Sequence, residues 1–107
     1  KRYGTGMVDW SSYEAHQKTA WQRQLHIYEV PFYYIEYGMA QLGAIAVWRN
    51  YKQNKERALD HFDSALKLGY TKSIGAVYAA ADIKFDFSAN YVKELADFVK
   101  QELEALK

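Results

Sequence analysis

The chain has 107 residues and a formal net charge of +1, with 14 Lys and Arg against 13 Asp and Glu. This balance excludes the basic surface stripe that is typical of nucleic-acid-binding proteins. The absence of cysteine excludes disulfides and thiolate metal sites, and it fits a reducing, cytoplasmic compartment. No run of 18 apolar residues occurs, so no membrane-spanning segment is expected. The start at Lys1 rather than Met favours a piece of a longer protein.

The first predicted helix covers residues 12–24, SYEAHQKTAWQRQ. Ser11 is expected to cap it, and Glu14 at the third helical position would complete a capping box. Proline disfavours helical backbone in the residue before it but suits a first helical turn itself. Residues 25–30 are therefore expected to form a helix end and a short extended link, and a second helix is expected to open at Pro31.

The second predicted helix, residues 31–50, is apolar on almost every side, so it is expected to be buried on every side. Four amphipathic helices are too few to cover it, which again favours a longer parent protein. Gly38 and Gly43 each cost about 1 kcal/mol relative to Ala in a helix, and such glycines are typical of positions that a ligand or another backbone approaches. Glu36 would be a buried carboxylate that needs a partner such as Arg23.

Three further helices are predicted, each with a side-chain cap and apolar residues at helical spacing. They are 55–68 after Asn54, 74–81 after Ser73, and a last helix after Ser88 or Asn90 that carries Val92, Leu95, Val99, Leu103 and Leu106. Gly69 is expected to end the first of these. The segment 82–87 alternates apolar and polar residues and is expected to be extended. The predicted fold class is all-α, with about five helices and short loops.

Known catalytic motifs are missing from this chain. The three histidines do not form a His-Glu-x-x-His pair, and there is neither a P-loop nor a Gly-x-Ser-x-Gly elbow.

What remains is a tyrosine cluster at the start of helix 31–50. Tyr34 and Tyr37, three residues apart, would share a helix face, and a phenol can donate a hydrogen bond to an oxygen that gains negative charge. His26 could be a second donor. From composition alone, ordinary packing of these side chains is the favoured interpretation.

Residues 31–44 contain the run Pro-Phe-Tyr-Tyr-Ile-Glu-Tyr, followed by Ala-Gln-Leu-Gly-Ala at 40–44. This segment resembles the C-terminal part of oligoendopeptidase F-type metallopeptidases of the M3 family. The resemblance covers most of the chain and continues through IAVWRNYKQNKERALDHFDSALKLGYT and AADIKFDFSANYVKELADFVKQEL. It implies a mostly helical enzyme whose deep channel admits short peptides. It also implies one zinc, held by a His-Glu-x-x-His helix and a downstream glutamate, with the motif glutamate activating a water that attacks the peptide carbonyl.

The same resemblance assigns roles to residues of this chain. It implies that His26, Tyr34 and Tyr37 bind the substrate carbonyl and the oxyanion, with Tyr33 as a substrate-binding residue. Gly38 is expected to be substrate-binding too, because a glycine inside a helix is typical of a position that a ligand approaches. Tyr33 is the weaker candidate, because the neighbouring Tyr34 points about 100° away on a helix. The zinc ligands would lie upstream of this chain, so no zinc is expected in it alone. The expected partners are short peptides and the remainder of the parent chain, without nucleic acid or membrane.

A helical interaction module is the alternative interpretation. Ala58, Phe62 and Ala65 have the spacing of the second helix of a tetratricopeptide repeat, and Leu42 and Ile45 fall near the first-helix positions. Only one such unit is found, whereas stable solenoids need about three. Such a module would bind peptides without cleaving them. Self-association of the isolated piece is also expected if its apolar faces are exposed.

Overall fold

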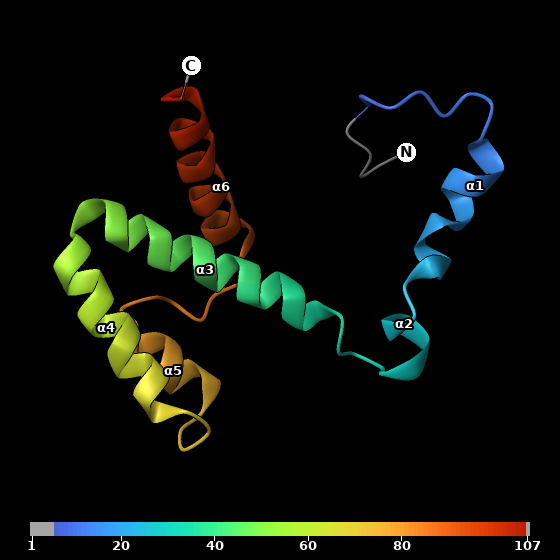
Figure 1. Cartoon of the computed structure of the whole chain (residues 1–107). Coiled ribbons are helices and arrows are strands. Elements are labelled where there is room, and N and C mark those ends of the chain that lie inside the picture. The colour runs from blue at the N-terminus through green and yellow to red at the C-terminus, as the bar shows by residue number, and fades with distance from the viewer. Residues whose placement is uncertain (1–5, 107) are drawn as a thin grey trace. The chain divides into compact units, whose positions relative to one another are not determined.

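The computed structural model describes residues 6–106, and within them it contains helices, turns and loops but no strand (Figure 1). The predicted all-α fold class is thereby confirmed. The chain divides into two compact units, Lys1–Ile35 and Glu36–Lys107, which are described in turn. No helix of the described residues is long and apolar enough to cross a membrane.

The first unit contains short helices only. They are α1 (Glu14–Thr19), a 3-10 helix (Ala20–Arg23) and α2 (His26–Glu29). The predicted capping box is wrong, because Tyr13 occupies the cap position of α1 and makes no side-chain cap. Ser11 instead donates its backbone N–H to Asp9 Oδ1 at 2.9 Å. Asp side chains form such local turns readily. Since α1 begins only at Glu14, Ser11 lies before the cap position.

The start of the long helix differs from the prediction. It is α3 (Ile35–Gln53), which begins four residues after Pro31. The Tyr33 N–H donates to the Val30 carbonyl at 3.1 Å, and Phe32 has a φ of 64°. Proline followed by a residue with positive φ is the pattern of a type II turn. That turn replaces the expected first helical turn, and α2 replaces most of the expected extended link.

The second unit contains α3, α4 (Lys55–Leu68), α5 (Ile74–Ala80) and α6 (Ala89–Glu104). Its predicted caps are confirmed. Side-chain oxygens of three residues accept from backbone N–H groups in the first helical turn, namely Asn54 from Arg57, Ser73 from Ala76 and Ser88 from Tyr91. Gly69 follows α4 with a φ of 52° and a ψ of −131°, a positive-φ backbone that favours glycine, and it ends the helix as predicted. Residues 83–88 have neither helix nor strand.

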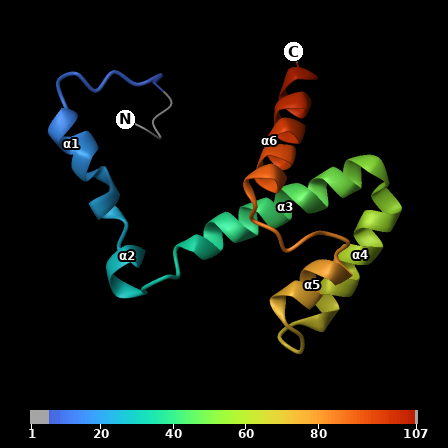
Figure 2. The same ribbon diagram turned by 180° about the vertical axis from the view of Figure 1, so that it is seen from behind.

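A small core joins α3 to α6. Its buried members are Ala46, Tyr91 and Leu95, and the partly buried side chains that pack against them are Leu42, Ile45 and Ile83. Figures 1 and 2 show α6 beside the middle of α3, and α5 beside α4. The prediction that α3 is buried on all sides is wrong for this chain, since only its Gly43 and Ala46 are buried. Glu36 is exposed, so it is not the buried carboxylate that was expected.

Three polar contacts link α3, α4, α5 and the segment that follows α5. Asp82, in the link after α5, has a φ of 57°, and its carboxylate pairs with Arg57 at 2.8 Å. The Asp82 carbonyl accepts from Asn50 Nδ2 at 2.8 Å. The Tyr78 hydroxyl donates to the Met39 carbonyl at 3.1 Å. These contacts set the spacing between the helices that line the groove described below.

Candidate functional site

Three of the five predicted site residues lie together in the first unit. His26 is the first residue of α2 and is half-buried. The Tyr33 ring stacks on the His26 ring, with 6.2 Å between centroids and 6° between planes. The Tyr34 ring lies 5.4 Å from that of His26 and is tilted by 45°. The turn at Pro31 brings these rings together because it returns the chain toward the start of α2.

Tyr37 and Gly38 belong to the second unit, where they lie in the first turn of α3. Tyr34 precedes this helix, so the expected relation of Tyr34 and Tyr37 on one helix face does not hold. Tyr37 is 52% exposed, and Tyr33 and Tyr34 are each 42% exposed. None of the three is therefore sealed inside packed side chains. A Cβ added at Gly38 would meet no atom within 4 Å.

These five positions offer neutral hydrogen-bond donors and an accessible backbone. A tyrosine hydroxyl donates without carrying a charge, and a histidine ring can donate from either nitrogen according to its tautomer and protonation state. Such groups suit a carbonyl oxygen that becomes more negative during a reaction. Within residues 6–106, no group of three or more His, Cys, Asp and Glu could hold a metal ion.

Two other tyrosines, Tyr78 and Tyr91, have structural positions that the sequence did not indicate. Burial, with a smaller contribution from Tyr91, raises the pKa of the Tyr78 hydroxyl above its usual value. Tyr91 is 4% exposed, and its buried hydroxyl has no hydrogen-bond partner within the described part of the chain. The Lys84 ammonium lies 5.7 Å from the centroid of the Tyr91 ring. In the sequence, Tyr78 lies within the predicted helix 74–81 and Tyr91 within the last predicted helix, and this position alone does not distinguish a buried tyrosine from an exposed one.

An apolar groove lies between α3 on one side and α4 and α5 on the other, with a volume of about 520 Å³. Its α3 wall consists of Ala40, Gly43, Ala44, Val47, Trp48 and Tyr51. The opposite wall includes Leu59, Phe62 and Leu66 of α4 and Val77 and Tyr78 of α5. The sequence predicted the apolar faces of these helices but gave no sign that they would remain open toward each other.

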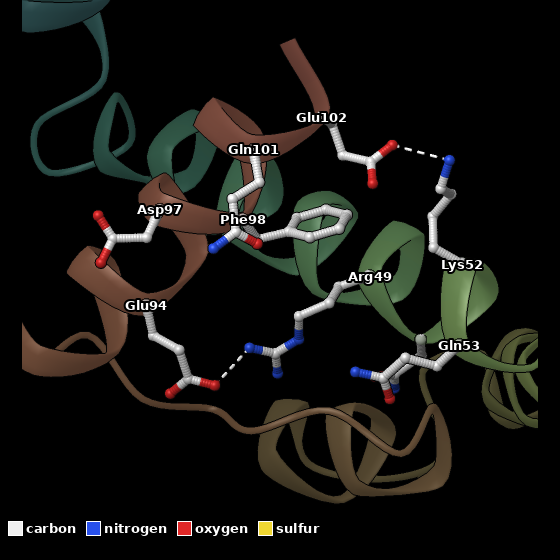
Figure 3. Close-up of a pocket in the computed structure, with 9 residues that line it drawn as sticks. Arg49, Lys52, Gln53, Glu94, Asp97, Phe98, Gln101 and Glu102 are labelled. Atoms are coloured by element: carbon white, nitrogen blue, oxygen red, sulfur yellow. Dashed lines mark hydrogen bonds and ion pairs between the residues drawn. The ribbon is translucent and has the colours of Figure 1, made fainter. Parts of the chain in front are cut away.

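A second cleft, between α3 and α6, is polar and has a volume of about 650 Å³ (Figure 3). Arg49 pairs with Glu94 at 2.5 Å, and Lys52 pairs with Glu102 at 2.8 Å. Figure 3 shows the Phe98 ring between these two ion pairs. Partly exposed pairs of this kind contribute only about 0–1 kcal/mol each. The charges satisfy one another across the cleft and link α6 to α3.

The comparisons with known proteins identify no relative. No family model, no curated protein and no solved structure matches this chain. The residues themselves, the contacts described above and the resemblance of the segment around Pro31 are therefore the basis for assigning a function.

Proposed function

We propose that this chain contributes substrate-binding and oxyanion-stabilising donors to a zinc oligopeptidase of the oligoendopeptidase F type, M3 family. The observation that carries the proposal is the arrangement around the Pro31 turn. His26 contacts the rings of Tyr33 and Tyr34, and the tyrosines remain accessible. His26 lies just before the run that resembles the family, and Tyr33 and Tyr34 lie within it. In an enzyme of that family, such a cluster of hydrogen-bond donors would bind the substrate carbonyl.

The proposed roles follow from donor chemistry. His26, Tyr34 and Tyr37 donate hydrogen bonds to the carbonyl oxygen of the peptide bond under attack, which gains negative charge as the tetrahedral intermediate forms. Tyr33 contacts the bound peptide beside His26. Gly38 lets the peptide backbone approach α3, because it has no side chain and no neighbour within 4 Å of where a Cβ would lie. The zinc ligands and the water-activating glutamate belong, in this proposal, to the remainder of the parent chain.

The proposed substrates are short peptides, and the proposed setting is the cytoplasm. The absence of cysteine fits that compartment, and the near-neutral charge gives no basis for a nucleic-acid partner. The other proposed partner is the remainder of the parent peptidase chain.

Replacement of Tyr37 by Phe in the parent enzyme tests the proposal. We expect kcat for a short peptide to fall roughly 100-fold, the scale of one lost oxyanion donor, with little change in KM. Tyr70→Phe is the matched control, because Tyr70 is fully exposed on the turn after α4. An unchanged kcat in the Tyr37 variant would remove Tyr37 from the proposed role.

The origin of the zinc site has a separate test. We expect the genomic reading frame upstream of Lys1 to encode His-Glu-x-x-His within a few hundred residues. We also expect elemental analysis of the purified 107-residue chain to find no stoichiometric zinc. Either a reading frame that begins at this point or one zinc per chain would contradict the proposed division of the site.

A non-catalytic peptide-binding module is the second candidate, and the apolar groove is the observation that favours it. Ala58 and Ala65 are buried, as expected for the second helix of a repeat, but Phe62 is 41% exposed. Leu42 and Ile45 pack against the cluster that includes Tyr91 and Leu95 of α6. This module would bind peptides with the same affinity whether or not an upstream zinc-binding half is present.

A further inference from the structure

We propose that Tyr33 is a positioning residue for His26, which it holds through its aromatic ring rather than through its hydroxyl. The stacked Tyr33 ring stops the imidazole from turning, so that the same ring nitrogen always faces the substrate. The effect on catalysis rests on the proposed function, whereas the restraint of the His26 ring does not.

The contact between the rings of His26 and Tyr33 is a parallel one. The two ring planes differ by 6°, and the ring centroids lie 6.2 Å apart. Offset parallel rings attract each other through their faces, and this attraction needs no hydroxyl. Tyr34 also contacts the imidazole, with 5.4 Å between centroids, but its ring is tilted by 45°. Of the two tyrosines, Tyr33 is therefore the one that covers the imidazole with a ring face.

The backbone between the two residues sets this geometry. The Val30 N–H donates to the His26 carbonyl at 3.2 Å, and the Tyr33 N–H donates to the Val30 carbonyl at 3.1 Å. Phe32, inside the second of these turns, has a φ of 64°, which is unfavourable for a residue with a Cβ. Its side chain is 96% exposed, so packing of Phe32 does not account for this conformation. The turn that returns Tyr33 to His26 requires it.

The orientation of the His26 ring determines which groups it offers. A half-turn about the Cβ–Cγ bond exchanges each ring nitrogen with a ring carbon, which removes the donor from its place. In the present orientation Nδ1 is buried, and a half-turn would put Cδ2 there instead. To make that half-turn, the imidazole must pass through an orientation perpendicular to the Tyr33 face, which breaks the parallel contact. A stacked ring is thus the kind of contact that fixes this orientation.

Proton NMR of the 107-residue chain tests the restraint without reference to any activity. Protons that lie over the face of an aromatic ring resonate upfield, and the His26 signals are assigned by their loss in His26→Gln. We expect Tyr33→Phe to keep the upfield position of these signals, because the ring remains, and Tyr33→Leu to move them downfield. His61 is the internal control, because its ring contacts the Ala80 carbonyl in the second unit. Equal positions of the His26 signals in the two variants would overturn the proposal.

Variants of Phe32 test the turn while leaving Tyr33 in place. Phe32→Gly and Phe32→Val both remove the phenyl ring, but only glycine accepts a positive φ without strain. We expect the His26 signals to keep their upfield position in Phe32→Gly and to lose it in Phe32→Val. The same signal positions in both variants would show that the turn does not place Tyr33 on the imidazole, and would overturn this part of the proposal.

Kinetics of the parent enzyme separate the Tyr33 ring from its hydroxyl. We expect Tyr33→Leu to lower kcat for a short peptide by up to roughly 100-fold, the cost of misplacing a catalytic group by about 1 Å, with a smaller change in KM. Tyr33→Phe should recover most of that loss, because it restores the ring. Tyr34→Phe is the matched comparison, because Tyr34 is equally exposed and contacts the same imidazole. It should lower kcat roughly 100-fold, since its proposed role needs the hydroxyl.

The outcomes separate this proposal from the proposed function. A loss of kcat in Tyr33→Phe equal to that in Tyr33→Leu would overturn the positioning role, because the hydroxyl would then be the essential group. An unchanged kcat in His26→Gln would instead remove His26 from the proposed donors. In that case the NMR comparison would still decide whether Tyr33 holds the imidazole.

Discussion

Gly43 and Gly38 look alike in the sequence but have different surroundings in the fold. A Cβ at Gly43 would lie 2.9 Å from the Tyr78 hydroxyl oxygen and 3.2 Å from the ring carbon that bears it. Tyr78 cannot move away freely, because its hydroxyl donates to the Met39 carbonyl. Gly43 is therefore required by the close approach of α5. Gly38 has open space around it, which leaves it available for the proposed peptide contact.

Alanine substitutions at the two glycines should have opposite effects. Gly38→Ala should stabilise the chain by up to about 1 kcal/mol, the difference in helix propensity. Gly43→Ala gains the same propensity but must displace Tyr78, and overpacking costs about 1–3 kcal/mol, so we expect net destabilisation. Urea unfolding of both variants measures these changes. Stabilisation by Gly43→Ala would show that the Tyr78 ring does not restrict this position.

Tyr78 also predicts a pH dependence. Its folded-state pKa is raised by burial, so the folded chain holds the phenolic proton more tightly than the unfolded chain does. The resulting stability is fully present below the usual tyrosine pKa of 10.0 and is lost as the pH rises above it. We expect the free energy of unfolding to fall above pH 10, and to fall less steeply in Tyr78→Phe. Parallel pH profiles of the two proteins would contradict this origin.

At the scale of elements, the helix starts of the second unit were predicted better than those of the first. Asn54, Ser73 and Ser88 each cap the helix that follows them. Ser11 does not, because α1 begins only at Glu14 and Tyr13 occupies its cap position. Pro31 does not start α3, because the turn closed by Tyr33 and Val30 comes first. Local hydrogen bonds of this kind compete with helix starts, and the residue pattern does not show which of them forms.

Paired cap variants test this difference. Asn54→Ala should destabilise the second unit by about 1 kcal/mol, because Arg57 N–H loses its acceptor. Ser11→Ala should change stability by less than about 0.5 kcal/mol, the usual range for surface positions without such a role. Thermal or urea unfolding followed by circular dichroism measures both. A loss in Ser11→Ala equal to that in Asn54→Ala would restore the capping role predicted for Ser11.

At the scale of the whole molecule, the second unit depends on very few buried side chains. Among the described residues, Leu95 is the largest side chain that is fully buried. It lies between α6 and α3 beside Ala46 and Tyr91. Since net folding stability is only about 5–15 kcal/mol even for ordinary domains, so small a core leaves little reserve.

Leu95→Ala should therefore have a large effect. The substitution typically costs about 2–5 kcal/mol at a buried site, and we expect it to abolish cooperative unfolding of the second unit. Leu103→Ala is the matched control on the same helix, because Leu103 is 59% exposed. Calorimetry or urea titration provides the measurement. A cooperative transition retained at the same midpoint in Leu95→Ala would show that the α3–α6 cluster is not the main source of stability.

The sequence by itself determined the fold class, the three caps of the second unit and the end of α4, because helical spacing, capping groups and a glycine that accepts a positive φ act over only a few residues. It also identified the tyrosine and histidine cluster as a set of possible donors. Only the tertiary structure decided that His26 contacts Tyr33 and Tyr34, that Tyr78 requires Gly43, and that α3 and α4 leave an apolar groove between them. These features depend on which side chains from distant parts of the chain meet, and periodicity along one helix carries no information about its neighbours.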